Sequence, residues 1–282
     1  MKITIIGCGL IGGSLALTLK RRRPEHIIAC LDLKERIPAI IEAGVADRVG
    51  SIDNPDDLAA YIPESDLVVI ATPVQFVADT IIRLKPFLKK NTIVTDVGST
   101  KNRIMAEAQG LLPDGVHFIG GHPMSGIEKS GFENSYGHLF DGTSMILCKD
   151  QYTNLIALKA AEMLFTDIGF TRVTITTAAE HDRIIAFTSQ LAHIVSSAYI
   201  KSETAKGQLG FSAGSYKDMT RVARLDENMW TELFMENKEH LSAEIDNIIK
   251  SLVEYSDALS LGDSDRMKAL LLDGKKAKEA IG

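Results

Sequence analysis

The sequence predicts an α/β protein of two domains, the first built on a parallel sheet and the second made of helices. A glycine-rich segment directly follows an apolar strand near the start of the chain, and short apolar strands alternate with helical segments up to residue 175. After residue 176 the sequence contains no convincing strand. Apolar strands that alternate with helices are typical of βαβ units in a parallel sheet. We therefore expect an α/β domain over residues 1–175 and a helical domain over residues 176–282.

The expected elements follow from the change between strand and helix periodicity along the chain. The predicted strands are residues 3–6, 27–31, 67–71, 92–97, 117–119, 143–147 and 172–175. The predicted helices are residues 10–19, 36–43, 76–88, 101–112, 152–168, 178–206, 228–260 and 263–280. In the helix over residues 228–260, an apolar face is formed by Trp230, Leu233, Phe234, Leu241 and Ile245.

Composition and charge exclude several classes of protein. The chain has 282 residues, 45% of them apolar and 24% charged, and a formal net charge of −6. An acidic chain without a long basic run is a poor candidate for nucleic-acid binding. Its three scattered cysteines form neither a disulfide framework nor a zinc site, so we expect no metal. No apolar run is long enough to span a bilayer, so we expect no membrane partner. The run at residues 3–19 contains four glycines and is not a secretory signal, and this together with the cysteine pattern predicts a cytoplasmic location.

A dinucleotide-binding motif opens the first domain. The segment from Gly7 to Gly12 has the pattern G-x-G-x-x-G and stands between a predicted strand and a predicted helix. In a Rossmann-type domain the first glycine allows a tight turn, the second lets the backbone approach a pyrophosphate, and the third lets helix and strand pack closely. The amino end of the helix then faces the phosphates. The candidate cofactor contacts here are Gly7, Gly9, Leu10, Ile11 and Gly12.

Two further positions complete the predicted cofactor site. Asp32 lies 20 residues after Gly12 at the end of the second strand, where a carboxylate accepts hydrogen bonds from a ribose 2′-hydroxyl and repels a 2′-phosphate. The sequence therefore predicts NAD as the cofactor, with NADP as the less favoured alternative because basic residues lie nearby. Thr72 and Pro73 follow another apolar strand, where a loop would touch the cofactor.

Three polar clusters, at residues 96–101, 120–129 and 216–221, are candidates for the chemistry. Ligands of open α/β sheets bind beyond the carboxyl ends of the strands, which is where the first two clusters lie. His122 follows a predicted strand, and an imidazole there is suited to take a proton from an alcohol during hydride transfer. A turn histidine that is bonded to backbone is an equal alternative.

Two further residues have both a functional and a structural interpretation. Arg221 could hold a substrate carboxylate bidentately or form a surface ion pair with a neighbouring aspartate. His193 interrupts an apolar helix, where a satisfied core histidine is the more common situation.

Taken together, these motifs resemble those of the prephenate/arogenate dehydrogenase family of tyrosine biosynthesis. The segments that carry the resemblance are residues 7–14, 96–101, 121–131 and 216–223, followed by Trp230, and they occur in the family's order. The resemblance implies an NAD-dependent enzyme that oxidatively decarboxylates prephenate to 4-hydroxyphenylpyruvate. It also implies a homodimer formed through the helical domain.

The resemblance also assigns roles to individual residues. It implies that His122 is the base for the ring hydroxyl and that Ser99 bridges the hydroxyl, His122 and the nicotinamide. Arg221 would bind a substrate carboxylate, and His193 would line the side-chain end of the pocket. The remaining substrate-site candidates are Glu128 near the pocket entrance and Lys217, Asp218 and Trp230 in the wall.

One departure from the family pattern concerns substrate choice. Many members have a histidine three residues before the position of His193, and this chain has Gln190 there. Arogenate is therefore retained as the alternative substrate, whose oxidation would give tyrosine directly. Two more distant alternatives are a β-hydroxyacid-type dehydrogenase, which typically uses a lysine that residues 176–200 lack, and a non-catalytic NAD-binding protein.

Overall fold

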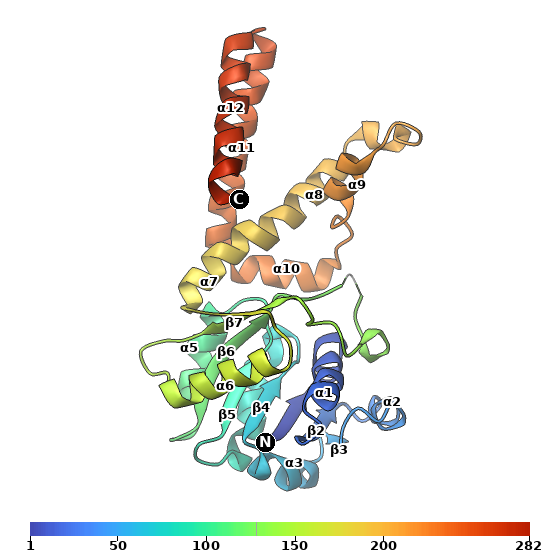
Figure 1. Ribbon diagram of the computed structural model, residues 1–282, viewed down its shortest axis with the longest axis vertical. Helices are drawn as coiled ribbons and strands as arrows, with labels where there is room; N and C mark the ends of the chain where they lie inside the picture. The colour runs from blue at the N-terminus through green and yellow to red at the C-terminus, as the bar shows by residue number, and fades with distance from the viewer. Residues whose placement is uncertain (128) are drawn as a thin grey trace. The chain divides into compact units, whose positions relative to one another are not determined.

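One eight-stranded sheet organises the first part of the chain. The computed structural model describes residues 1–127 and 129–282. The strand order is β3-β2-β1-β4-β5-β6-β7-β8, and all neighbours pair in parallel except β6 and β7, which are antiparallel (Figure 1). The strands are β1 (Lys2–Ile6), β2 (Ile27–Asp32), β3 (Arg48–Ser51), β4 (Leu67–Ile70), β5 (Ile93–Asp96), β6 (His117–Pro123), β7 (Ser144–Cys148) and β8 (Arg172–Thr176).

The central strands form because their β-branched and aliphatic residues are buried on both faces, as parallel strands require. The four residues of β4 are all buried, and so are the last four of β1. One apolar cluster joins the sheet to α1 (Leu10–Arg22), α2 (Ile37–Glu42) and α6 (Leu155–Asp167). A second cluster joins it to α3 (Pro55–Tyr61), α4 (Val77–Leu84) and α5 (Asn102–Leu111). The sheet therefore has helices on both faces, and the predicted Rossmann-type fold is confirmed.

The sheet differs from the prediction in three places. The edge strand β3 and the helix α3 were not predicted, because the β3 sequence Arg-Val-Gly-Ser is short and mostly polar. The strand β7 runs antiparallel to β6, so the sheet is mixed rather than wholly parallel. The strand β6 continues to Pro123 instead of ending at residue 119. His122 consequently lies within a strand, paired opposite Ile146 of β7.

The chain divides into two compact units. The first unit comprises residues 1–185 and 224–236, and the second comprises residues 186–223 and 237–282. The division falls ten residues after the predicted boundary at 175, and it assigns α10 (Glu227–Glu236) to the first unit. Burial explains this assignment of α10, because Leu233 and Trp230 belong to the apolar cluster of the first unit.

Two predicted long helices are interrupted. The helix predicted over residues 178–206 consists of α7 (Ala178–Ile185), a π-helical segment (Ala186–Leu191), α8 (Ala192–Ile200) and a 3-10 turn. The helix predicted over residues 228–260 breaks at Asn237 into α10 and α11 (Lys238–Ser260). Asn237 has non-helical backbone angles and a buried side chain. The residues of α10 and α11 therefore do not share the single apolar face that was predicted.

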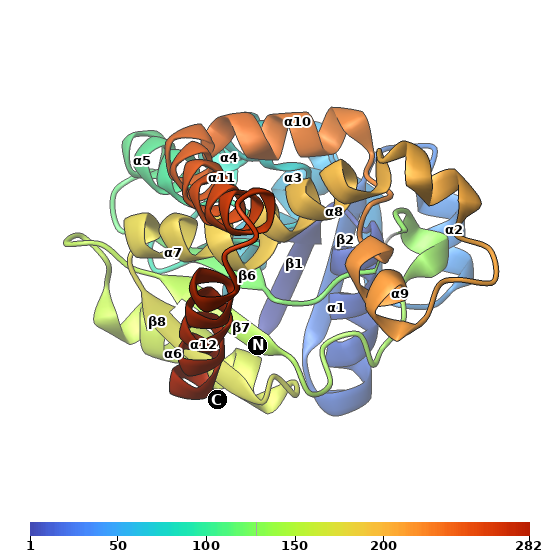
Figure 2. The same ribbon diagram turned by 90° about the horizontal axis from the view of Figure 1, so that it is seen from above.

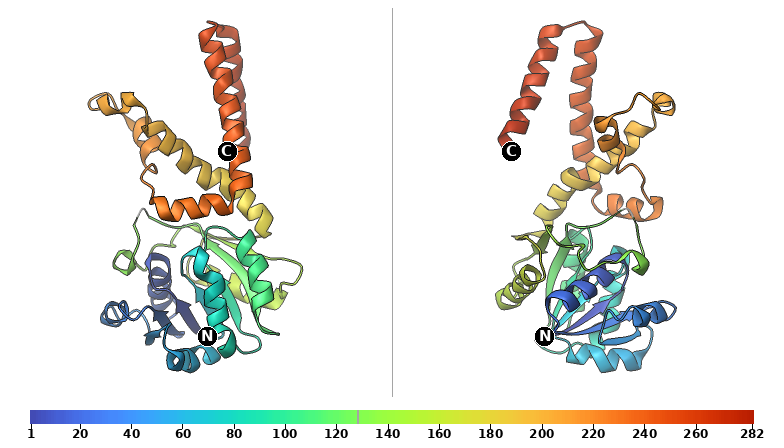
Figure 3. Two further views of the ribbon diagram at one scale, coloured as in Figure 1. Left: turned by 180° about the vertical axis from the view of Figure 1, so that it is seen from behind. Right: turned by 45° about the vertical axis from the view of Figure 1, so that its right-hand side comes forward.

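The second unit is helical throughout. Helix α9 (Gly214–Thr220) lies beside α8, as Figures 1 and 2 show, and the Ser196 hydroxyl of α8 donates to the Met219 carbonyl at 2.7 Å. Helices α11 and α12 (Ser264–Ile281) form a helical hairpin (Figure 3), in which the Tyr255 hydroxyl donates to the Leu270 carbonyl at 3.3 Å. In the part of the chain that the structure describes, no helix is both long and apolar enough to cross a membrane.

Candidate active site

The glycine motif forms the turn between β1 and α1. Gly7 has a φ of +88°, a conformation that glycine adopts readily, and a Cβ built there would lie 2.9 Å from the Ala71 carbonyl oxygen. A Cβ on Gly12 would lie 1.9 Å from the Gly7 carbonyl oxygen. Gly9 is different, since a Cβ there would meet nothing within 4 Å. Gly7 and Gly12 are therefore required by the protein's own packing, while Gly9 borders open space.

The amino end of α1 faces this open space without competition from protein side chains. Gly9 caps the helix without a side-chain hydrogen bond, and the first turn contains no acidic residue. The first N–H groups of a helix lack partners within it and carry a partial positive charge. A phosphate group beside Gly9 would meet those N–H groups, so this turn fits the pyrophosphate of a dinucleotide.

Asp32 ends β2 beside the glycine turn and is only 4% exposed. One carboxylate oxygen accepts from the Cys8 backbone N–H at 2.6 Å, and the other accepts from the Leu33 N–H at 2.7 Å. An ionised carboxylate has about four acceptor positions, so two bonds fix its orientation and leave capacity for ribose hydroxyls. Arg36 approaches the same carboxylate at 3.9 Å from the protein surface.

The side-chain hydroxyl of Thr72 also fits a bound dinucleotide. Its hydroxyl oxygen is buried, and no hydrogen-bond partner for it is found among the described residues. The Thr72 backbone nitrogen lies 3.1 Å from the position of a Cβ on Gly7, so this hydroxyl belongs to the same turn. Buried hydroxyl groups are normally hydrogen-bonded. The orphaned hydroxyl, the open space at Gly9 and the free amino end of α1 all fit a bound dinucleotide.

The two residues after the motif have a structural role. A Cβ on Gly13 would lie 2.9 Å from the Phe132 ring, and the Ser14 hydroxyl accepts the Tyr136 backbone N–H at 3.0 Å. Helix α1 thereby anchors the segment that follows the motif at residues 121–131. The small residues in this part of α1 are needed to let that segment approach.

His122 is held at the carboxyl end of β6 by a second histidine. Its Nδ1 lies 2.9 Å from Nε2 of His181, the two rings meet edge to face, and His181 Nδ1 lies 2.7 Å from Oδ1 of Asp182. Among the described residues, no hydrogen bond is found at Nε2 of His122. The alternative of a turn histidine bonded to backbone is therefore wrong.

Burial of the His122 ring, the proximity of His181 and the positive charge of Lys101, in that order, lower the pKa of His122 well below 6.5. Each of these factors disfavours the imidazolium form. His122 is consequently a neutral imidazole near neutral pH. A neutral imidazole with an unpartnered nitrogen at a strand end can accept a proton from a ligand.

A buried ion pair connects the motif at residues 96–101 with the motif at residues 121–131. Lys101 and Asp96 pair with no exposed side-chain surface. The Asp96 carboxylate also accepts the backbone N–H of Gly98 at 2.8 Å and that of Gly121 at 3.1 Å. A Cβ on Gly121 would lie 2.4 Å from the Asp96 carbonyl oxygen, so this approach requires glycine. Asp96 therefore brings the loop that carries Ser99 to the strand that carries His122.

The structure distributes the other predicted substrate residues over the two units. Ser99 and Trp230 belong to the first unit with His122, and the Trp230 ring packs 5.2 Å from that of Phe234. Five candidates belong to the second unit: Gln190, His193, Lys217, Asp218 and Arg221. Glu128 lies outside the described residues.

Within the second unit, two of these residues are engaged by the protein itself. Gln190 is 2% exposed, and its side-chain oxygen accepts from the Asn237 amide at 2.8 Å. His193 Nδ1 lies 3.0 Å from the Val222 carbonyl, which orients its Nε2 away from that bond. Lys217, Asp218 and Arg221 are exposed on and after α9.

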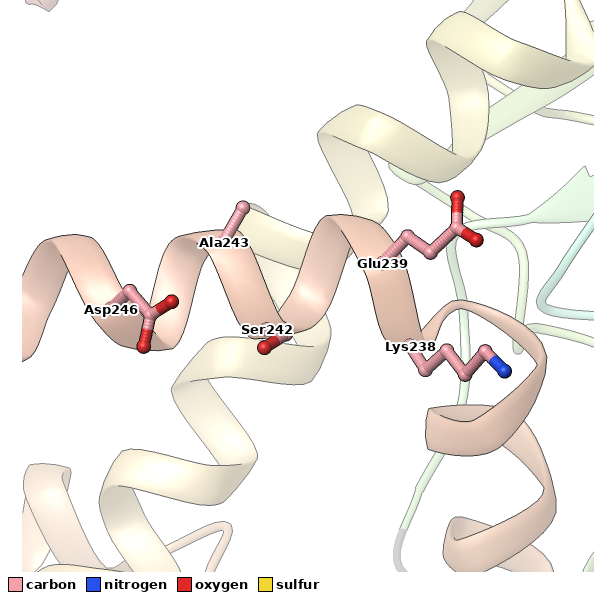
Figure 4. A pocket seen from close by; sticks show the side chains of 5 residues that line it. All are labelled: Lys238, Glu239, Ser242, Ala243 and Asp246. Carbon is pink, nitrogen blue, oxygen red and sulfur yellow. The ribbon is translucent and has the colours of Figure 1, made fainter.

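A hollow in the surface of the second unit lies along one helix. It measures about 570 Å³ and is lined along α11 by Lys238, Glu239, Ser242, Ala243 and Asp246 (Figure 4). All five residues come from one helix, and none is a candidate for the chemistry. The hollow therefore has no part in the site built from the motifs.

Sequence reasoning missed the residues behind the candidate base. His181, Asp182, Lys101 and Asp96 form a buried polar group around His122. The cluster at residues 96–101 included Asp96 and Lys101 without assigning them a role, and His181 and Asp182 were not singled out. The adjacent His-Asp pair, at the start of a predicted apolar helix, was the available signal. Its connection to His122, 59 residues away, could not be seen from spacing.

The glycine turn, the buried carboxylate at the end of β2 and the neutral imidazole of His122 define a dinucleotide-dependent dehydrogenase. Comparison with known proteins gives the family. Residues 15–174 match the model described as the nucleotide-binding domain of prephenate dehydrogenase, and residues 177–273 match its dimerization domain. The chain belongs to the prephenate dehydrogenase family, which confirms the resemblance found in the motifs.

Individual relatives match over nearly the whole chain. A prephenate dehydrogenase of Lactococcus lactis is 32% identical, covering 99% of this chain and 77% of that protein. A cyclohexadienyl dehydrogenase of Zymomonas mobilis is 29% identical, covering 99% and 95%. The crystal structure of Aquifex aeolicus prephenate dehydrogenase with hydroxyphenyl propionate and NAD+ has a TM-score of 0.85 and 27% identity, covering 100% and 98%. That of Synechocystis arogenate dehydrogenase has a TM-score of 0.84 and 26% identity, with full coverage of both chains.

Proposed function

We propose that this protein is an NAD-dependent prephenate dehydrogenase, which converts prephenate to 4-hydroxyphenylpyruvate and CO2. The observation that carries the reaction is His122, a neutral imidazole at the carboxyl end of β6 whose Nε2 is open to a ligand. Membership of the family supports the substrate. The first 175 residues would bind the dinucleotide, and residues 176–282 would provide substrate contacts and the homodimer interface.

NAD, when bound, supplies the acceptor for the hydride. The backbone at Gly7, Gly9, Leu10, Ile11 and Gly12 would hold the pyrophosphate. The Asp32 carboxylate would accept the adenosine ribose hydroxyls and disfavour a 2′-phosphate, which favours NAD over NADP. Thr72 and Pro73 would contact the cofactor from the loop after β4.

The chemical step requires a base, orientation and binding of two carboxylates. The carbon that bears the ring hydroxyl loses a hydride, and the hydroxyl loses a proton to Nε2 of His122. The bond to the ring carboxylate then breaks, CO2 leaves, and the electron pair completes the aromatic ring as a phenolate, which takes the proton back from His122. Ser99 would hydrogen-bond the same hydroxyl and orient it toward His122.

The remaining candidates would bind the substrate. Arg221 would hold a carboxylate, because guanidinium and carboxylate form paired charge-assisted hydrogen bonds. His193 would line the side-chain end of the pocket, with Gln190 next to it in the helix. Further contacts would come from Glu128, Lys217, Asp218 and Trp230.

The direct test is the initial rate of NADH formation with purified protein and NAD, compared between prephenate and arogenate. A higher rate with prephenate is expected. The alternative function, arogenate oxidation to tyrosine, is favoured by the relatives that act on cyclohexadienyl substrates and by Gln190 in place of a histidine. A preference for arogenate would establish that alternative, and no turnover of either would contradict both.

We propose a cytoplasmic location. The three cysteines are free and buried, which suits a reducing compartment. Immunodetection in fractionated cells of the source organism tests this proposal.

A further inference from the structure

Behind the proposed base lies a second histidine that is entirely buried. The His181 side chain has no exposed surface, and the Asp182 side chain is 2% exposed. His181 bridges the two groups, with Nε2 at 2.9 Å from His122 Nδ1 and Nδ1 at 2.7 Å from Asp182 Oδ1. His181 and Asp182 come from α7, and His122 comes from β6, so two separate elements meet here.

The hydrogen bonds of Asp182 fix where the protons lie. Its Oδ1 accepts the Lys101 backbone N–H at 2.8 Å, and its Oδ2 accepts the Asn102 N–H at 2.9 Å. These are the N–H groups of the N-cap residue and of the first residue of α5, which have no partner within the helix. A carboxylate can only accept, so the His181 Nδ1 must carry the proton that it donates.

The tautomer of His122 follows from that of His181. A neutral His181 that is protonated on Nδ1 presents a lone pair at Nε2. The His122 Nδ1 must then be the donor, which leaves its Nε2 as a bare acceptor. That is the form needed to take a proton from a substrate hydroxyl. The opposite tautomer would present an N–H to the hydroxyl and could not act as a base.

We propose that His181, oriented by Asp182, is a positioning residue that fixes the reactive tautomer of His122 and receives its Nδ1 proton when the base is charged. This inference rests on the proposed function of His122. One proton enters at His122 Nε2 from the substrate, and one moves from His122 Nδ1 to His181 Nε2. The positive charge then lies beside the Asp182 carboxylate. No electron or additional reactant is required.

The surroundings favour this transfer. Burial, the neighbouring His181 and Lys101, in that order, oppose a positive charge on His122 and lower its pKa. Lys101 is itself paired with Asp96, and both act on the Cys148 thiol. Burial raises the pKa of Cys148 to about 12, so that it remains a neutral thiol. The Asp182 carboxylate is the negative group bonded to His181 itself, so charge on His181 is compensated there.

Two substitutions at one position separate orientation from proton transfer. In His181→Gln the amide oxygen can occupy the place of Nε2 and accept from His122 Nδ1, which preserves the tautomer but accepts no proton. In His181→Asn the amide stays beside Asp182 and does not reach His122. We expect kcat with prephenate to fall by about 10²-fold or more in His181→Asn and by less in His181→Gln, with KM unchanged in both.

His117→Asn, on the same strand β6 but outside the site, is the matched control and should retain the wild-type rate.

The tautomer itself is read by nitrogen NMR of histidine-labelled full-length protein, with the His122 signal assigned from a His122→Asn variant. We expect protonation on Nδ1 in the wild type and in His181→Gln. Protonation on Nε2 in the wild type, or an unchanged kcat in His181→Asn, would overturn the proposal. Because the NMR signal requires no turnover, an enzyme inactive on prephenate would refute the proposed function while the tautomer still tests this inference.

Discussion

The contrast between Gly9 and Gly12 gives a prediction that separates cofactor binding from folding. Gly9 has backbone angles of φ −75° and ψ −154°, which alanine tolerates, and its missing Cβ would meet nothing within 4 Å. Gly9→Ala should therefore change the free energy of unfolding by no more than about 0.5 kcal/mol. The methyl group would instead occupy the space proposed for the pyrophosphate.

The expected loss of affinity can be calculated from the contacts at that place. A hydrogen bond to a charged group contributes about 1.5–3 kcal/mol, so loss of one such bond should raise the Kd for NAD by about 10- to 150-fold. Gly12→Ala should instead destabilise the ligand-free protein, because its Cβ would lie 1.9 Å from a backbone oxygen. Overpacking of this kind costs about 1–3 kcal/mol and should lower Tm by several degrees.

Calorimetric titration with NAD and thermal unfolding of the ligand-free protein measure the two effects. The expected pattern is weak NAD binding at a wild-type Tm for Gly9→Ala, and a lowered Tm for Gly12→Ala. Wild-type NAD affinity in Gly9→Ala would refute the placement of the pyrophosphate. A wild-type Tm in Gly12→Ala would refute the packing role of that glycine.

Four further predictions concern the site. His122→Asn should lower kcat by about 10²–10⁴-fold in steady-state assays, and an unchanged kcat would exclude His122 as the base. Because the pKa of His122 is lowered and its neutral form is the active one, the acid limb of the wild-type rate profile should lie below pH 6.5, and a limb above that value would contradict the electrostatic account. Arg221→Ala should raise KM for prephenate by about 10- to 150-fold, so an unchanged KM would remove Arg221 from the carboxylate site. Lys101→Met should lower the free energy of unfolding in urea by about 3–5 kcal/mol, because it leaves the Asp96 charge buried and unpaired, and wild-type stability would contradict that.

The lowered pKa of His122 also makes the free energy of unfolding depend on pH. Folding lowers the pKa of His122 below its unfolded value of 6.5, so between the two values the unfolded chain binds more protons than the folded protein. His122 therefore removes stability as the pH falls from 6.5 through its folded pKa. In His122→Asn this part of the acid destabilisation should be absent, as urea unfolding across that range would reveal.

Much of the first domain follows from local pattern. The buried strands β1, β2, β4 and β5 are short runs of mainly apolar residues, and the glycine turn and Asp32 have fixed positions relative to β1 and β2. The exceptions were elements stabilised by pairing rather than by composition. The polar edge strand β3 and the extension of β6 to Pro123 depend on neighbouring strands, which a periodicity analysis does not include.

In the second half of the chain, the periodicity of apolar residues did not predict where one helix ends and the next begins. The pattern of apolar residues continues through Asn237, and it therefore predicted one helix. The chain breaks there because the Asn237 amide is buried against Gln190, a contact between residues 47 positions apart. Gln190 was identified from a departure in a motif, whereas its partner carried no signal of its own.

For the candidate site, the sequence identified residue types but not the partners that set their chemistry. His122 was proposed as a base on its position after a strand, with a structural alternative left open. Its tautomer and lowered pKa depend on His181 and Asp182, which approach from α7. Such long-range contacts determine protonation and cannot be derived from spacing.

The most direct test of the account is a parallel measurement of NADH and CO2 formed from prephenate by the wild-type protein with NAD. Oxidative decarboxylation predicts equal amounts of the two products, both lost together in His122→Asn. NADH without CO2, CO2 without NADH, or undiminished formation of both in His122→Asn would contradict the reaction and the role of its base.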